Sequence, residues 1–271
     1  MFYSRRVGGN PSRDPEVNAD ETILENPDKV KLFNALKISG RTNKGLGVGF
    51  FNAVTEKTEA VIKNGITGEI RKETTEPWAN YNVFVLDQRF SGNSSVSFVN
   101  TNVTRNGEFR DANVTALLFD INNKKNTYNY YGSSKASFVL QDGTKSGNES
   151  ALGFNKVSGE NRFGANYFIR TKEFDINDLG YLNQTNFHRL NAKYSYRFLQ
   201  PKGDLNILNY NLTITHTRRL DNDLFTELIL HNSIEMQTKK YFIFGGGLLI
   251  WRMGKNAIFE RNIQLAEAAL R

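Results

Sequence analysis

The stretch NYNLTITHT, residues 209–217, decides the fold class. Tyr210, Leu212 and Ile214 alternate with asparagine and threonine, and successive side chains of an extended chain point to opposite faces. One face of this stretch is therefore apolar and the other is polar. A period of two over this length predicts a β-strand rather than a helix.

The same alternation recurs along most of the chain. It is clear in RFGANYFIR at residues 162–170, in NTYNYYGSSKASF at 126–138, and in residues 187–198. Clusters of Asn, Gly, Asp and Lys separate the alternating segments. We therefore predict an all-β, antiparallel fold with about twelve strands. They cover approximately residues 31–42, 45–55, 78–90, 94–105, 111–122, 126–139, 150–158, 161–171, 185–199, 204–218, 224–237 and 239–252.

Strand length and turn pattern favour a β-barrel of the outer-membrane type. Strands of soluble proteins usually have about 5–6 residues, whereas a tilted strand that crosses a bilayer needs about 9–11. Most of the predicted strands reach the greater length. A soluble β-sandwich is the alternative, because it also has strands with one apolar face. The connections between strands are of two kinds. Short turns lie at 42–44, 91–93, 122–125 and 158–160, and longer loops lie at 56–77, 140–149 and 172–184. Alternation of short and long connections is typical of outer-membrane barrels.

The composition excludes several other classes of protein. The 35 Lys and Arg residues are interleaved with 28 Asp and Glu, so the net charge of +7 does not form a basic block and we expect no nucleic-acid partner. The absence of cysteine excludes disulfides and Cys-ligated metals. No apolar run approaches the roughly 18 residues of a transmembrane helix.

The N-terminal FYSRRVGG, residues 2–9, contains two arginines but does not read as an export signal. A polar and acidic segment follows it, whereas a signal peptide needs an apolar core of about 7–15 residues. We divide the chain into an N-terminal loop segment at 1–29, a partial barrel domain at 30–252 and an atypical tail at 253–271. The tail is rich in Ala, Leu and Glu and predicts a short helix.

Four motifs carry a family resemblance: FYSRRVGG, LKISGRTNKGLGVGFFNAVT at 36–55, NYNVFVLDQ at 80–88 and FDINDLGYL at 174–182. In this order they resemble the barrel domain, of unknown function, of Bacteroidetes-type outer-membrane proteins. The resemblance covers about residues 2–250. In that family a carbohydrate-binding, family-9-like domain precedes the barrel, and the first motif lies well inside the chain.

The resemblance implies a fragment of a larger protein. We expect the signal peptide and the sugar-binding domain upstream of this chain, and we expect the barrel to lack its closing strands. The implied location is the bacterial outer membrane. The implied partners are outer-membrane lipid and, through the missing domain, polysaccharide.

Only one metal site suggests itself, and its pattern is incomplete. Residues 175–180, DINDLG, resemble the opening of a calcium loop, but Leu179 and Asn186 stand where the fifth and twelfth residues should supply ligands. An Asx-stabilised connection between two strands is the simpler interpretation. The weak calcium candidates are Asp175, Asn177 and Asp178.

We assign no catalytic or cofactor-binding residue. The run GLGVGF at 45–50 has phenylalanine where a dinucleotide fingerprint needs its third glycine, so we expect no cofactor. The three histidines are too scattered for a zinc motif, and we interpret them as residues at strand ends. No pair stands out among Asp87, Asp120, Glu227 and Glu235 as the two carboxylates of a glycosidase.

The sequence therefore favours an outer-membrane barrel segment of a cell-envelope protein associated with carbohydrate binding, and more readily a non-enzyme than an enzyme. The role of the barrel itself is not defined. Two alternatives come from other classes. One is a glycan-processing hydrolase with carboxylates on its long loops, and the other is a soluble β-sandwich that binds polysaccharide through Trp78 and Tyr81.

Overall fold

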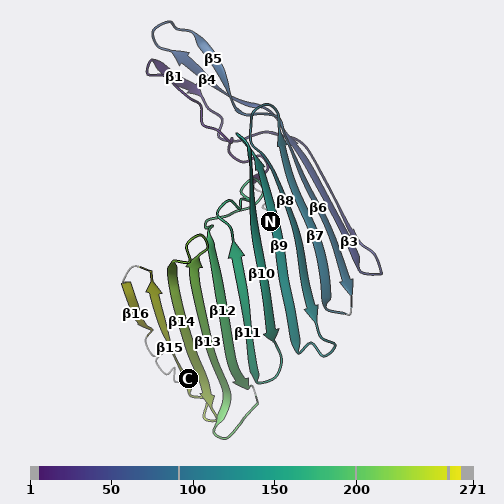
Figure 1. The fold of residues 1–271 in the computed structure, drawn as a ribbon, viewed down its shortest axis with the longest axis vertical. Helices are drawn as coiled ribbons and strands as arrows, with labels where there is room; N and C mark the ends of the chain where they lie inside the picture. The colour runs from purple at the N-terminus through teal and green to yellow at the C-terminus, as the bar shows by residue number, and fades with distance from the viewer. Residues whose placement is uncertain (1–5, 91, 199, 255–256, 264–271) are drawn as a thin grey trace.

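The computed structural model describes residues 6–90, 92–198, 200–254 and 257–263. Within these ranges the chain forms sixteen strands in two antiparallel sheets, which confirms the predicted all-β fold. Thirteen strands lie side by side in one large sheet in the order β16 down to β6, then β3 and β2 (Figure 1). The strands are β1 Glu21–Glu25, β2 Leu32–Arg41, β3 Leu46–Thr55, β4 Thr58–Asn64, β5 Ile70–Glu76, β6 Ala79–Phe90, β7 Ser94–Arg105, β8 Asp111–Asn122, β9 Tyr128–Leu140, β10 Thr144–Lys156, β11 Asn161–Arg170, β12 Phe187–Phe198, β13 Leu205–Arg219, β14 Phe225–Thr238, β15 Ile243–Met253 and β16 Ala257–Ile263.

The large sheet has two chemically different faces. Directly opposed residues of an antiparallel ladder point to the same face, and Phe154 is opposed by Tyr130 on one side and Ala165 on the other. We call the face with this row the outer face and the opposite one the inner face. Apolar residues of the outer face are exposed over most of its strands: Val48, Phe50, Val96, Leu117, Tyr130, Phe138, Leu152, Phe163, Leu190, Ile214 and Ile234.

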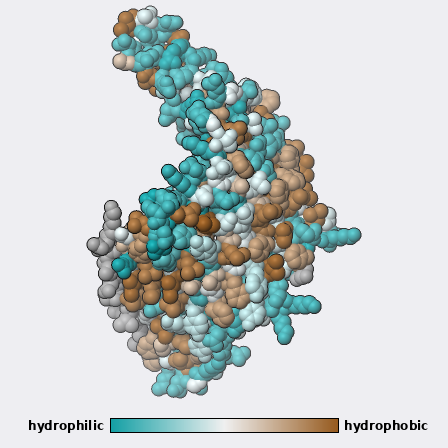
Figure 2. Space-filling model, in the orientation of Figure 1, coloured by the Kyte–Doolittle hydropathy of each residue, from teal (hydrophilic) through white to brown (hydrophobic). Residues whose placement is uncertain are grey.

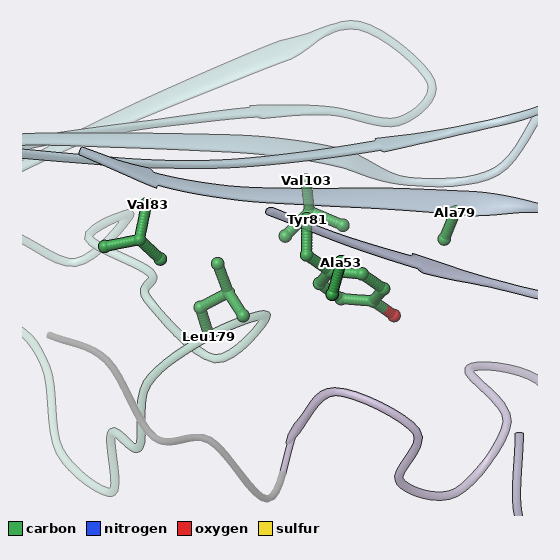
Figure 3. Packing of buried hydrophobic residues seen from close by; sticks show 6 residues of the cluster. All are labelled: Ala53, Ala79, Tyr81, Val83, Val103 and Leu179. Atoms are coloured by element: carbon green, nitrogen blue, oxygen red, sulfur yellow. The ribbon is translucent and has the colours of Figure 1, made fainter. Parts of the chain in front are cut away.

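The inner face carries the hydrophobic cluster of the molecule. Ala53, Tyr81 and Val103 oppose one another on β3, β6 and β7 and are almost completely buried. Leu179, from the connection between β11 and β12, lies opposite these strand residues (Figure 3). The connection therefore folds back against the inner face instead of extending into solvent.

The small sheet β1–β4–β5 projects beyond one end of the large sheet and is largely hydrophilic (Figures 1 and 2). It corrects two expectations. Residues 21–25 were expected in a loop but form β1, and the long loop predicted at 56–77 contains the hairpin of β4 and β5. These strands are short and rich in charge, so their alternation is weaker than that of the large sheet.

Two further expectations are wrong in detail. The connection predicted at residues 140–149 is a tight turn, because β9 and β10 pair continuously from Leu140 opposite Thr144. Residues 257–263, expected to be helical, form β16, since the edge of β15 offers unpaired backbone groups with which the chain can pair. Residues 255–256 and 264–271 of the predicted tail lie outside the described part of the chain.

Across the described residues, the large sheet is open. Its edge strands β2 and β16 do not pair with each other, so these strands do not form a closed barrel. A sandwich requires a second sheet packed face to face, whereas the small sheet, whose ladders join only β1, β4 and β5 among the described strands, projects beyond one end of the large sheet (Figure 1). No helix within the described ranges is long and apolar enough to cross a membrane.

Candidate functional site

The connection between β11 and β12, residues 171–186, is the inward loop of this structure. Phe174 is only 1% exposed, and the main chain at this residue passes directly over Gly147 of β10. A Cβ atom on Gly147 would lie 2.1 Å from the Phe174 nitrogen, so only glycine permits this approach. The amide of Asp175 then donates a hydrogen bond to Oγ of Ser137 on β9, at 3.0 Å.

Short polar side chains hold the turn of the inward loop. The carboxylate of Asp175 accepts a 2.9 Å hydrogen bond from the amide of Asn177, and Oδ1 of Asn177 accepts one from the amide of Leu182 at 2.9 Å. The amide of Gly180 donates to the carbonyl of Ile176 at 2.6 Å. The weak calcium candidates thus lie in an Asx-stabilised turn, the simpler of the two interpretations of this motif.

A buried ion network fastens the inward loop to the strands. Nη1 of Arg105, at the end of β7, donates to Oδ1 of Asp178 at 2.9 Å, and its Nε donates to Oε1 of Glu76 at 3.0 Å. The exposed fractions of these side chains are 7% for Arg105, 8% for Asp178 and 2% for Glu76. Arg110 also contacts Asp178, with Nε at 2.9 Å and Nη2 at 2.7 Å from Oδ2. Asp178 therefore has two arginine partners. Two of the weak calcium candidates, Asp175 and Asp178, thus have arginine side chains as their charged partners.

Asp175 of the loop and Arg110, which precedes β8, are held in their charged forms. Burial alone would raise the pKa of Asp175, but the amide of Asn177 and the guanidinium of Arg110 outweigh it and keep this pKa below the usual value. Burial would likewise lower the pKa of Arg110, and its hydrogen bonds to Asp178 and Asp175 outweigh it in the opposite direction. In the part of the chain described here, no three His, Cys, Asp or Glu residues are placed to hold a metal ion.

The inward loop is also where the four sequence motifs meet. Nε of Arg6, in the first motif, donates to the carbonyl of Gly180 in the fourth motif at 3.2 Å. Ala53 of the second motif and Tyr81 of the third pack with Leu179 of the fourth in the inner cluster (Figure 3). Val7 of the first motif also packs against this cluster. Motifs separated by more than a hundred residues therefore build one site on the inner face.

A second buried charge cluster lies beside the inward loop. Glu149 of β10, 3% exposed, is paired with both Lys135 of β9 and Arg170 of β11. Nη1 of Arg170 also donates to the carbonyl of Gln184 at the end of the loop, at 2.6 Å. The C-terminal end of the loop is thus tied to a charged residue of the inner face, and Thr171 at its other end bonds to Asn148 of β10.

Two cavities open on either side of the inward loop. One, of about 570 Å³, lies between the loop and the turn at β9 and β10, and includes Lys145 and Lys172 in its lining. The other, of about 560 Å³, lies between the loop and the N-terminal segment at residues 6–12. Arg110 and Asn177 line both cavities, so the ion network forms the wall between them.

The carboxylates considered for glycoside hydrolysis are not brought together. Asp87 pairs with Arg41 and accepts from Ser97 at 2.8 Å, while Glu227 pairs with Arg189 at 3.2 Å. No contact joins any two of the four carboxylates in the described ranges. The three histidines are also apart: His188 is at a strand end as expected and contacts Asp223 at 3.1 Å, whereas His231 lies in the middle of β14.

The glycines of GLGVGF serve packing within the sheet. Gly47 lies under the guanidinium of Arg41, whose Nη2 would be 2.8 Å from a Cβ there, while Leu46, Val48 and Phe50 are exposed on the outer face. Asp178 is a residue that the sequence motif indicates, but its partners Arg105 and Arg110, and Glu76, which pairs with Arg105, were not predicted. These residues lie at or next to the ends of strands, where charged side chains are common. Nothing in their spacing along the sequence indicates that they contact one another.

Comparison with known proteins gives one match. A family model described as "Domain of unknown function (DUF5916)" matches residues 1–268. No curated protein and no solved structure matches the chain. The match confirms the part of the resemblance that concerns a domain of unknown function, whereas the outer-membrane context and the upstream sugar-binding domain stay predictions.

Proposed function

Since the chain belongs to the DUF5916 family, whose domain has no assigned function, its activity must be inferred from the structure. We propose that this domain forms the wall of an outer-membrane β-barrel in a cell-envelope protein associated with carbohydrate binding. One observation carries the proposal: the outer face exposes apolar side chains strand after strand, while the inner face buries charge under the inward loop. A soluble domain would leave that outer face in water, which is unfavourable over so large an area.

Aromatic residues of the outer face, near the turns at 122–125 and 158–160, support a lipid contact. The ring of Phe154 lies 4.9 Å from that of Tyr130 and 6.2 Å from that of Phe163, measured between ring centroids. Tyr194 and Tyr210 follow on β12 and β13, with 6.4 Å between their centroids. Aromatic girdles of this kind mark the interface between lipid and water in outer-membrane barrels, because the rings are apolar and the hydroxyls are polar.

Over β9, β10 and β11 the inner face has the opposite character, as the lumen of a barrel requires. Its charged residues have partners that an apolar layer could not supply, such as Glu149 with Lys135 and Arg170. The association with carbohydrate rests on the resemblance of the four motifs, which also suggests the outer membrane as the location. In this proposal the barrel anchors a sugar-binding domain or passes its ligand inward.

Single-cysteine labelling tests the proposal, because the chain contains no cysteine of its own. Ile214 and Thr213 are neighbours on β13 that point to the outer and inner faces. We expect an environment-sensitive fluorophore on Ile214→Cys to be quenched by lipid-attached nitroxides in vesicles. The same label on Thr213→Cys should be quenched by a water-soluble quencher instead. Water accessibility at both positions would overturn the proposal.

A further inference from the structure

The cavity between the N-terminal segment and the inward loop has an unbalanced charge. Four cationic side chains line it, from Arg6, Lys29, Arg105 and Arg110. Only two carboxylates line it with them, those of Glu76 and Asp178. The cavity is thus enriched in positive charge on a molecule whose charges are otherwise interleaved.

Arg105 and Arg110 do not account for this excess. Arg105 and Arg110 are paired with Glu76 and Asp178, so these four groups balance. Asp175 adds one more negative charge, but it contacts Arg110 from the neighbouring cavity. Even when Asp175 is counted, one positive charge remains.

That excess lies on Arg6 and Lys29. Arg6 uses only its Nε, which donates to the carbonyl of Gly180, and the Nζ of Lys29 donates to Oδ1 of Asn10 at 2.8 Å. Neither side chain has a carboxylate partner among the residues that the structure describes. Two cations with neutral partners therefore face a volume of about 560 Å³, and an arginine fork suits a carboxylate.

We propose that this cavity binds a small hydroxylated carboxylate, with Arg6 and Lys29 receiving its negative charge. The neutral polar residues of the lining, Asn10, Ser12 and Tyr81, supply donors and acceptors for hydroxyl groups. The volume suits one or two six-membered rings, since small-molecule sites have about 300–1,000 Å³. The assignment adds a ligand to the proposed barrel and does not depend on whether the outer face contacts lipid.

Titration calorimetry with the purified chain tests this assignment, with glucuronate as the probe and glucose as its uncharged match. We expect glucuronate to bind and glucose to bind at least about tenfold more weakly, because the charge-assisted hydrogen bonds are lost. No binding of glucuronate at millimolar concentration, or equal affinity for glucose, would contradict the assignment.

Two variants locate the site. Arg6→Gln combined with Lys29→Gln should weaken glucuronate binding by about tenfold or more. Lys31→Gln is the matched control, because Lys31 is exposed nearby but does not line the cavity, and it should bind like the parent. A thermal melt of each variant confirms folding. If the double variant folds and binds normally, the cavity is not the site. The labelling of residues 213 and 214 has a separate readout, so failure of either proposal is distinguishable from failure of the other.

Discussion

Gly147 shows how one residue determines whether the inward loop can dock. Its missing side chain leaves room for the main chain at Phe174, and the three atoms nearest to a Cβ placed there all belong to Glu173 and Phe174. We expect Gly147→Ala to destabilise the protein by about 1–3 kcal/mol, since overpacking must shift the loop. Chemical denaturation followed by tryptophan fluorescence measures this loss.

Gly40→Ala is the control for Gly147→Ala. Gly40 also lies in a strand, and nothing lies within 4 Å of a Cβ placed there. This variant should be as stable as the parent or slightly more stable, because alanine loses less conformational freedom on folding. Similar losses in both variants would mean that the loop does not pack against Gly147.

Arginine substitutions at Ile214 and Thr213 compare how strongly the outer and inner faces disfavour a charge. If the outer face contacts a bilayer, Ile214→Arg places a charge in the apolar layer and should destabilise the protein by about 2–4 kcal/mol near the midplane. Thr213→Arg points to the polar inner face and should have little effect. Unfolding in lipid vesicles by guanidinium compares them, and equal effects would argue against a lipid-facing outer surface.

At the scale of elements, Asp178 is the group on which the docking of the inward loop depends. Asp178→Asn would leave Arg105 and Arg110 with an amide in place of a shared carboxylate, in a setting where Arg105 is 7% exposed. Breaking such a buried pair destabilises by about 3–5 kcal/mol. We expect this loss in the free energy of unfolding, together with faster proteolysis of residues 171–186.

Glu160→Gln serves as the comparison. Glu160 pairs with Lys202 in a contact where both side chains are exposed, and surface pairs contribute little. Its free energy of unfolding should match that of the parent protein. An equally small effect of Asp178→Asn would show that the inward loop does not depend on its arginine partners.

The small sheet has its own dependence on pH. The hydrogen bond from Arg71, followed by that from the amide of Asn18, lowers the pKa of Glu21 from 4.5 to about 2. Because the pKa is lower in the folded state, the carboxylate contributes its full stabilisation above pH 4.5, and that contribution is lost as the pH falls towards 2. Carbon NMR of the Glu21 carboxyl should give a midpoint near 2. A midpoint near 4.5 would show that the pair with Arg71 does not form in solution.

The strands of the large sheet were predictable, whereas the site was not. Tyr210, Leu212 and Ile214 indicate their strand because alternation is a local property of the chain. Asp178 and Arg105 lie 73 residues apart, and no local pattern indicates that one neutralises the other. The strands of the small sheet were missed for a different reason, since β1 and β4 owe their pairing to each other rather than to a strong alternation of their own.

At the scale of the whole molecule, the two sheets have separate ladders and meet at the buried pair of Glu76, at the end of β5, with Arg105 of β7. The ladders of β1, β4 and β5 do not continue into the large sheet within the described residues. Replacing residues 60–72 with a short Gly-Ser turn should therefore remove the small sheet and leave the unfolding transition of the large sheet in place. Circular dichroism during denaturation tests this, and loss of the whole β signal would show that the two units are interdependent.

The inward loop also has a consequence for the order in which the chain folds. Each hairpin of the large sheet closes locally, so strands can be added one after another at small entropic expense. The contact between Arg6 and Gly180 instead spans 174 positions, and it cannot form until β11 and β12 are in place. Assembly should thus end with a locking step in which the loop, the N-terminal segment and the first strands become rigid together. Before that step, the strands of the large sheet would be paired, but the inward loop would not yet be packed against the inner face.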